Sequence, residues 1–375
     1  MERGEDGTVP VVGIFVESGS GPARLFVPCR GERSGGFSAA VPHRLVEQFH
    51  LRMGQEVAGQ ASAGGGGRLP QLVRVKTVDG LNPEERHRRI PFLRATTTFP
   101  NERLRTETEG GPLSCRIVDL FAPIGKGQRG LLVAPPKAGK TMLLQDIARG
   151  IGANRPDCHL IVLLVDERPE EVTEFRRSVN AELFASSNDE PVARHAHVSR
   201  LAFRRAQCLA EAGRDVVLLL DSLTRLARAF NGAMARSGRT MSGGLDSQAL
   251  EQPRQFFSFA RATEEAGSLT VLATVLVETG SRMDELIFQE FKGTGNMEIL
   301  LDRRAAERRL FPAISLHGTG TRREELLLDG RSREAALIMR RAAGEGKPDV
   351  ILGALLERMG KTQSNGELIR LLTGH

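Results

Sequence analysis

The fold of this chain is constrained most strongly by apolar runs in its second half. They are rich in leucine and β-branched residues and lack the polar alternation of a half-exposed strand, which is typical of strands buried on both faces. The runs are GLLVA (130–134), HLIVLLVDE (159–167), DVVLLLDS (215–222) and LTVLATV (269–275). Helix-like stretches such as TMLLQDIARGI and FSFARATEEA lie among them. The pattern predicts an α/β domain with a parallel sheet covered on both faces.

The first part of the chain has a different character. Short strand-like runs such as VVGIFV, ARLFV, QEVAGQA and QLVRVKTV are separated by glycine-rich turns, which predicts a small β-barrel or sandwich. Residues 81–111 are polar, basic and punctuated by Pro83, Pro91 and Pro100. We expect a linker there, with most of its arginines, Arg86 among them, solvated rather than bound to nucleic acid.

A phosphate-binding loop is predicted where the first apolar run ends. Gly139-Lys140-Thr141 matches the end of G-x-x-x-x-G-K-[ST], but Ala134 replaces the first glycine and two prolines follow it. Three matching residues are weak evidence alone. The preceding strand and following helix, however, direct backbone N–H groups toward a phosphate. Lys140 is expected to reach the β- and γ-phosphates of ATP, Thr141 to hold Mg²⁺, and Lys137 to add a second cation, while the prolines restrict the turn.

Two other apolar runs end in carboxylates. Asp221 ends one strand and is expected to bind Mg²⁺, because ligands of such sheets lie at the carboxyl ends of the strands. Glu167 ends another strand and is expected to orient and deprotonate the attacking water. The alternative for each is a surface charge at a strand end, but their combination with the loop predicts an ATP and Mg²⁺ site.

Composition limits the location of the protein, the chemistry of its cysteines and the kinds of partner it could bind. No apolar run is long enough to span a bilayer, and MERGEDGTVP has no signal-like apolar core, so no membrane association and a cytoplasmic location are expected. The four cysteines are far apart in the sequence and predict reduced thiols rather than a disulfide framework or metal site. A net charge of +6 permits a polyanionic partner, although tyrosine and tryptophan, which often stack on nucleic-acid bases, are absent.

Longer motifs carry a resemblance to a known family. From about Phe99 to about Asn365 the chain closely resembles the Rho family of bacterial transcription termination factors, in DLFAPIGKGQRGLLVAPPKAGKTMLLQDIA, LLVDERPEEVTEF, LLLDSLTRLARAFN, GSLTVLATVLVETGSRMDELIFQEFKGTGNMEI and ERRLFPAISLHGTGTRREELLL. The loop APPKAGKT is the form this family uses. The resemblance implies an α/β, RecA-type P-loop NTPase core with a small N-terminal OB/cold-shock-like β-barrel. The expected parts are a divergent RNA-binding domain (1–82), a basic linker (83–111) and an ATPase/translocase domain (112–375).

The resemblance also implies an activity and its partners. A homohexameric ring would hydrolyse ATP to pull single-stranded RNA through its centre in the 5′ to 3′ direction, until RNA polymerase is dislodged. Arg225 would contact the γ-phosphate region or a neighbouring subunit, and Arg322 would be an arginine finger that completes the neighbour's site. Arg168 would lie beside the nucleotide and Phe311 would stack on adenine. The remaining nucleotide contacts implied are Gly125, Lys126, Gly127, Gln128, Arg129, Gly130, Lys137, Ala138, Gly139, Lys140, Thr141 and Met142.

Two loops would face RNA in the pore of the ring. One is SGRTMSGGLD, with Arg239, Gly243 and Gly244, and the other is VETGSRMDE, with Arg282 at the family's basic pore position. Without the resemblance both would be interpreted as ordinary mobile loops.

The barrel departs from the family pattern. The strand that bears a tyrosine in the family reads GGFSAAVP, and Glu47-Gln48 stands where a basic pair is expected. Phe26 and Phe37 remain as possible stacking faces for RNA, and Phe26 is equally a candidate for the barrel core. Two alternatives to a shortened Rho stay open. The divergent barrel leaves room for a non-terminating regulatory ring in which ATP serves assembly. The RecA-type core is shared with subunits of rotary ATP synthases, although the two pore loops argue against a subunit of that kind.

Overall fold

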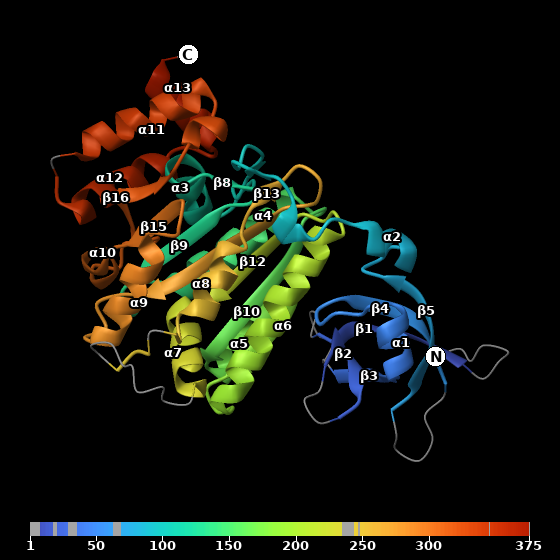
Figure 1. Ribbon diagram of the computed structural model, residues 1–375. Helices are drawn as coiled ribbons and strands as arrows, with labels where there is room; N and C mark the ends of the chain where they lie inside the picture. Colours follow the sequence, from blue (N-terminus) through green and yellow to red (C-terminus); the bar gives the residue numbers. More distant parts are fainter. Residues whose placement is uncertain are drawn as a thin grey trace.

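A computed structural model describes residues 8–17, 21–28, 36–62, 69–234, 244–246, 248–344 and 346–374. A small barrel at the N-terminal end packs beside a larger α/β domain, as Figure 1 shows. Among the described residues, no helix is long and apolar enough to cross a membrane. Of the four cysteines, Cys115, Cys158 and Cys208 are buried free thiols, whereas Cys29 lies outside the described residues.

The barrel contains five strands. They are β1 (Thr8–Val16), β2 (Ala23–Val27), β3 (Gly36–Val41), β4 (Glu56–Ser62) and β5 (Gln71–Val78), with α1 (His43–Gln48) between β3 and β4. The strands close in the order β1-β2-β3-β5-β4 around Phe15, Leu25 and Leu72. At Gly59 a Cβ atom would stand 2.0 Å from the Arg74 carbonyl oxygen, so only glycine allows β4 and β5 this close approach. The OB/cold-shock-like identity of this barrel stays a prediction.

The larger domain is built on a seven-stranded sheet in the order β11-β10-β12-β14-β9-β15-β16. The strands are β9 (Arg129–Ala134), β10 (His159–Glu167), β11 (Glu182–Ser187), β12 (Val216–Asp221), β14 (Leu269–Leu276), β15 (Met297–Leu301) and β16 (Ile314–Thr321). All neighbours pair in parallel except β15 and β16. The predicted apolar runs form adjacent strands, which confirms the α/β core.

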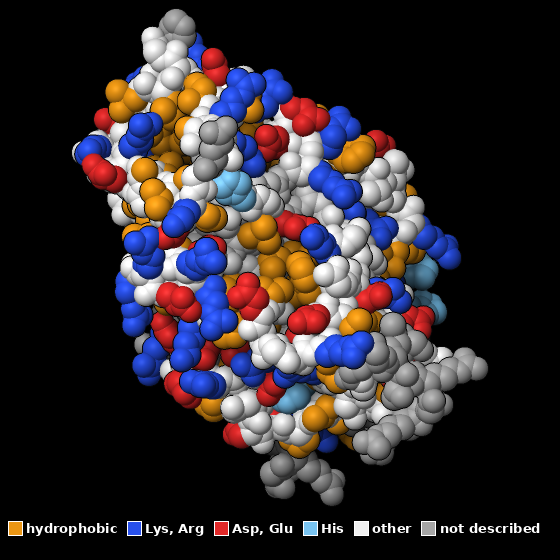
Figure 2. Space-filling view, turned by 90° about the vertical axis from the view of Figure 1, so that its left-hand side faces the viewer, with side chains coloured by type: hydrophobic (Ala, Val, Ile, Leu, Met, Phe, Trp, Pro, Cys, Tyr) orange, Lys and Arg blue, Asp and Glu red, His pale blue; other side chains and the backbone are white. Residues whose placement is uncertain are grey.

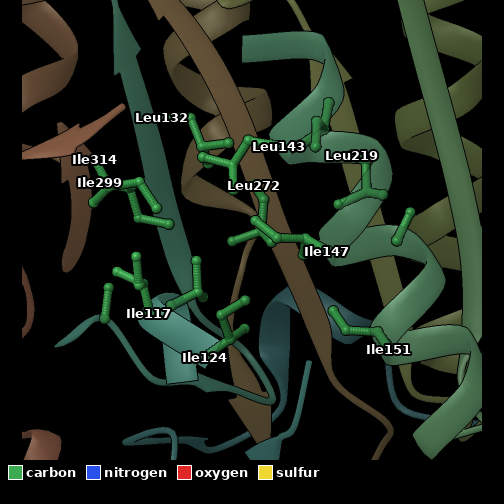
Figure 3. Packing of buried hydrophobic residues seen from close by; sticks show 14 of the residues in the cluster. Ile117, Ile124, Leu132, Leu143, Ile147, Ile151, Leu219, Leu272, Ile299 and Ile314 are labelled. Carbon is green, nitrogen blue, oxygen red and sulfur yellow. The ribbon is translucent and has the colours of Figure 1, made fainter. Parts of the chain in front are cut away.

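Helices cover both faces of this sheet. They are α3 (Leu113–Phe121), α4 (Lys140–Asn154), α5 (Pro169–Ser178), α6 (Val192–Glu211), α7 (Leu223–Ala233), α8 (Glu251–Ser258), α9 (Arg282–Lys292), α10 (Arg303–Glu307), α11 (Gly330–Ala343), α12 (Pro348–Gly360) and α13 (Asn365–Thr373). Because side chains alternate along a strand, Leu132 joins one hydrophobic cluster while Leu131 and Val133 join the other. Figure 3 shows the first cluster, in which Leu132 and Leu272 pack toward Leu143 and Ile147 of α4.

One helix prediction is wrong in part. The stretch FSFARATEEA continues α8 only as far as Ser258. Ala262 and Thr263 instead form β13, which pairs with β6 (Thr97–Thr98) in a short ribbon. Tertiary pairing with the segment that enters the domain has overridden the local helical pattern.

The segment between barrel and sheet is packed rather than loose. It contains α2 (Pro83–Arg88), the 3-10 turn Phe92–Arg94, and β7 (Arg103–Leu104), which pairs with β8 (Ile124–Gly125). Arg86 is buried, against the expectation for this basic stretch: its Nε lies 2.8 Å from Asp79 and its Nη1 lies 2.8 Å from Glu211 of α6. The two carboxylates explain how the guanidinium is accommodated inside the protein.

A second buried arginine joins the barrel to the sheet. Arg205 of α6 lies 2.9 Å from Glu56 of β4, 3.5 Å from Asp79 after β5, and 3.2 Å from Glu182 at the start of β11. Glu182 in turn lies within hydrogen-bonding distance of His159, the first residue of β10. The Arg205 guanidinium therefore ties two barrel segments to β11, and Glu182 links this contact to β10, the strand that ends at Glu167.

Candidate active site

The predicted phosphate loop connects β9 to α4. Gly139 adopts a left-handed backbone with φ of +89° immediately before α4, and Lys137 also has a positive φ of +65°. This turn points the first N–H groups of α4 out of the carboxyl edge of the sheet, where a phosphate would lie. The proline-containing form APPKAGKT thus supports a loop with the geometry that a phosphate requires.

Lys140 and two strand-end carboxylates meet at this edge. The Nζ of Lys140 donates to both oxygens of Asp221, at 2.6 and 2.8 Å, and to Oε1 of Glu167 at 3.2 Å. The hydroxyl of Thr141 donates to Oδ2 of Asp221 at 3.0 Å. Register explains the meeting, because Leu164 of β10 is paired with Asp221 at the end of β12.

Glu167 is almost completely buried, with 2% of its surface exposed. Burial raises the pKa of this carboxyl to about 7; the negative charge of Asp221 adds to the rise, and Lys140 and Arg225 oppose it. A carboxyl that titrates near neutrality is suited to accept a proton from water.

Arg225 and Thr274 support the two carboxylates. The Nε of Arg225 lies 3.3 Å from Oε1 of Glu167, and its Nη1 donates to the main-chain oxygen of Asp166. Thr274, buried in β14, donates its hydroxyl to Oδ1 of Asp221 at 2.7 Å. Thr274 was not among the predicted site residues, although a hydroxyl inside the apolar run LTVLATV was its signal.

The donor set fits a magnesium ion. Mg²⁺ prefers oxygen ligands and usually combines one or two protein ligands with waters and substrate phosphates. The Thr141 hydroxyl and the Asp221 carboxylate supply such oxygens side by side, and Lys140 places a positive charge against the same carboxylate. Among the described residues, no group of three or more histidine, cysteine or acidic side chains could hold a metal by itself.

A pocket of about 520 Å³ opens beside the loop. Its walls include Lys137, Ala138, Gly139 and Met142 on one side and Phe311 on the other. Phe311 is 46% exposed, so its ring is available to a flat apolar ligand. Arg168 is also exposed at this edge of the sheet, as the residue that precedes α5.

Other predicted nucleotide contacts lie at the opposite end of the sheet. Arg129 begins β9 at its amino end, roughly 17 Å along the strand from Ala134, and Gly125 to Gln128 precede it in the chain. Arg322 lies at that same amino end: its N–H donates to the carbonyl of Asn296 at 2.9 Å, and the side-chain oxygen of Asn296 accepts from the N–H of Arg129 at 2.8 Å. The structure therefore does not bring these residues to the phosphate loop of their own chain.

The structure describes only some of the residues expected to contact RNA in the pore. Arg239 and Gly243 lie outside the described residues. Gly244 lies near Met283, and Arg282, the first residue of α9, is exposed after the turn at Gly280, so the two candidate pore loops are neighbours.

The two barrel phenylalanines also differ. Phe37 is 47% exposed with the Arg24 guanidinium 5.1 Å from its ring centre, an arrangement open to a stacking base. Phe26 is half-buried between Phe37 and Phe184 of β11, with ring centres 6.0 and 6.5 Å apart, respectively. Figure 2 shows basic and acidic side chains interspersed over one face of the molecule, without a single dominant basic patch there.

The chain is similar to known proteins over most of its length. Residues 114–319 match the ATP synthase alpha/beta family, nucleotide-binding domain. Transcription termination factor Rho of Streptosporangium roseum is 49% identical over 347 residues, covering 92% of this chain and 88% of the relative. Rho of Streptomyces lividans is 47% identical over 369 residues, and the chain spans 52% of that relative's length. A solved ATPase from the type III secretion system of pathogenic bacteria has a TM-score of 0.58 at 23% identity, over 80% of this chain and 81% of that one, and shares the fold.

Proposed function

Since this chain belongs to the family of transcription termination factor Rho, we propose that it is an RNA-stimulated ATPase that assembles into a homohexameric ring and terminates transcription. The observation that carries the proposal is the site formed by Lys140, Glu167 and Asp221 at the carboxyl edge of the sheet. The same three groups serve ATP hydrolysis in P-loop enzymes.

The first step is a change of partner for Lys140. Its ammonium group is paired with two carboxylates, and bound phosphates would compete for it. Mg²⁺ on Thr141 and Asp221 would neutralise the developing charge on the phosphates. Phe311 would hold the adenine ring against the pocket next to the loop.

Glu167 would then act on the attacking water. Its carboxylate form accepts the proton, and Arg225, at 3.3 Å, favours that form and fixes its orientation. Thr274 would act indirectly, because it orients Asp221 and does not contact the substrate.

The position of Arg322 supports an assembly in which sites are shared. Arg322 follows the end of β16, beside the amino end of β15. It is therefore remote from the phosphate loop of its own chain and would reach a nucleotide only in an adjacent subunit. Arginine fingers supplied in trans accelerate hydrolysis by about 10³- to 10⁵-fold. Arg129, which is half-buried at that end of the sheet, would join the same intersubunit site, whereas the other residues of 125–130 are buried within their own chain.

RNA would pass between the loops that contain Gly244 and Arg282. The direction, 5′ to 3′, and the encounter with RNA polymerase follow from the family resemblance. ATP turnover in each site would move these loops through α7 and α9, since Arg228 of α7 holds Asp284 of α9 at 2.6 Å.

The test combines RNA stimulation with subunit mixing. ATP turnover of the purified chain is expected to rise on addition of single-stranded RNA. Lys140→Ala and Arg322→Ala are each expected to abolish it, and co-assembly of the two variants is expected to restore part of it, because one class of interface then has both groups intact. Arg323→Ala, the exposed neighbouring residue, is the matched control and should retain turnover. RNA-independent turnover that is unaffected by Arg322→Ala would refute the proposal and favour an ATP synthase-like subunit.

A further inference from the structure

A second pocket, of about 510 Å³, lies at the end of the ATPase domain far from the barrel. The segment around β7 and the starts of α11 and α13 enclose it, and in Figure 1 these helices lie at the top of the molecule. Four arginines line it: Arg103, Arg105, Arg331 and Arg370. Its volume is in the range of small-molecule sites in proteins.

The carboxylates of this pocket are already engaged by local donors. Asp329 caps α11, with Oδ1 accepting from the N–H of Ser332 at 2.8 Å and Oδ2 accepting from its hydroxyl at 3.0 Å. Glu107 accepts from the N–H of Asn365, the first residue of α13, at 2.6 Å. Both acids therefore serve helix ends rather than the arginines.

Three of the four arginines, in contrast, lack such partners. Arg105, Arg331 and Arg370 are exposed, and none has a carboxylate within 4.0 Å among the residues that the structure describes. Arg103 is 17% exposed; its Nη2 donates to the carbonyl of Asp119 and lies 3.5 Å from the Asp119 carboxylate, while its Nε is buried without any partner. The four arginines outnumber the two carboxylates of the lining, so the pocket has an excess of positive charge that a bound anion would offset.

We propose that this pocket binds a multiply charged phosphate ligand. Guanidinium groups pair with phosphate oxygens in a bidentate manner, and the helix ends of α11 and α13 add favourable electrostatics. The site is separate from the ATP loop, with which it shares no lining residue. A free polyphosphate, such as a nucleotide, and the backbone of RNA carry the same chemistry, so the experiment distinguishes these two sources.

Binding is measured by titration calorimetry on the full chain carrying Lys140→Ala, which removes the main phosphate contact of the ATP loop. The probes are inorganic tripolyphosphate and, separately, a short single-stranded RNA. The pocket variant adds Arg331→Glu and Arg370→Glu. The matched control adds Arg333→Glu and Arg341→Glu, two exposed arginines of α11 that do not line the pocket but change the net charge equally.

Tripolyphosphate is expected to bind the parent and the control alike and to bind the pocket variant at least about tenfold more weakly, because two charge-assisted contacts are lost. Loss confined to the RNA titration would support the site and assign its phosphate to nucleic acid. Equal affinity of pocket variant and control for both probes would overturn the proposal. If thermal unfolding shows the charge-reversed variant misfolded, Arg331→Ala with Arg370→Ala decides by the same criterion.

Discussion

Glu167 makes the stability of the chain depend on pH in an unusual direction. Its carboxyl titrates at an ordinary value of 4.5 when unfolded and at about 7 in the fold, where burial and Asp221 oppose its charge. Between pH 4.5 and about 7 the folded state holds a proton that the unfolded state has released. The free energy of unfolding therefore falls as pH rises through this window, by about 3 kcal/mol at about 1.36 kcal/mol per pKa unit.

Glu167→Gln removes this dependence, because the amide does not titrate. In buffer without nucleotide or Mg²⁺, the free energy of unfolding of both proteins is measured by urea titration from pH 5 to pH 8. The difference between the two proteins at each pH isolates the effect of Glu167, because the other titrating groups contribute equally to both. Relative to the wild type, the free energy of unfolding of the Gln variant is expected to rise by about 3 kcal/mol from pH 5 to pH 8. Glu174→Gln, which removes an exposed carboxylate from α5, is the matched control.

If the free energies of unfolding of wild type and Glu167→Gln differ by the same amount at every pH, the reasoning is refuted. That result would mean that Lys140 and Arg225 compensate the burial of Glu167 fully. The same series measured with Mg²⁺ and a non-hydrolysable ATP analogue should show a smaller slope, since added positive charge lowers the pKa of this carboxyl.

Three further predictions concern the attachment of the barrel, the packing of α4 and the position of Asp221. Arg205→Met leaves Glu182 and Asp79 buried without this cation and should lower the free energy of unfolding by about 3–5 kcal/mol in urea titrations, whereas Arg204→Met, at the exposed neighbouring position, should change it little. Gly150→Ala would place a Cβ 2.1 Å from the Thr106 carbonyl oxygen and should cost about 1–3 kcal/mol in the same assay; Gly353→Ala, in α12 with open space around it, should instead stabilise by about 0.5–1 kcal/mol. Thr274→Val keeps the side-chain shape but removes the 2.7 Å hydrogen bond to Asp221, and should raise the Mg²⁺ concentration for half-maximal ATP turnover about tenfold; an unchanged Mg²⁺ dependence would exclude the positioning role.

The connection through Arg205 has a consequence for how the two parts of the chain move. The barrel is held to α6 and to the first residue of β11 through the buried Arg205, which pairs with the buried Asp79 and Glu182 and with the partly exposed Glu56. At Gly54 a Cβ would stand 2.5 Å from the backbone of Arg204, so the barrel backbone also approaches α6 too closely for any other residue. A load on the barrel is therefore expected to reach the sheet as a rigid displacement rather than through a flexible hinge.

Local sequence predicted much of the core and of the nucleotide loop. An unbroken apolar run such as HLIVLLVDE can be satisfied only by burial on both faces, and the loop between a strand and a helix in APPKAGKT follows from residues adjacent in the chain. Glu167 and Asp221 were predicted for the same reason, because each directly ends such a run. Where neighbours in space compete with neighbours in sequence, prediction failed: FSFARATEEA has a helical pattern, yet Ala262 and Thr263 pair with Thr97 and Thr98.

Local patterns are thus sufficient to predict which strands are buried and which side chains stand at their carboxyl ends, because periodicity and adjacency are local properties. Other relations appear only in the folded chain. Arg322 and residues 125–130 lie across the sheet from Lys140, and Thr274 holds Asp221. Arg86 and Arg205 are buried among carboxylates. These relations depend on strand order, register and the docking of the barrel. Strand order and docking are set by the total surface that all elements bury together, which no single stretch of residues encodes.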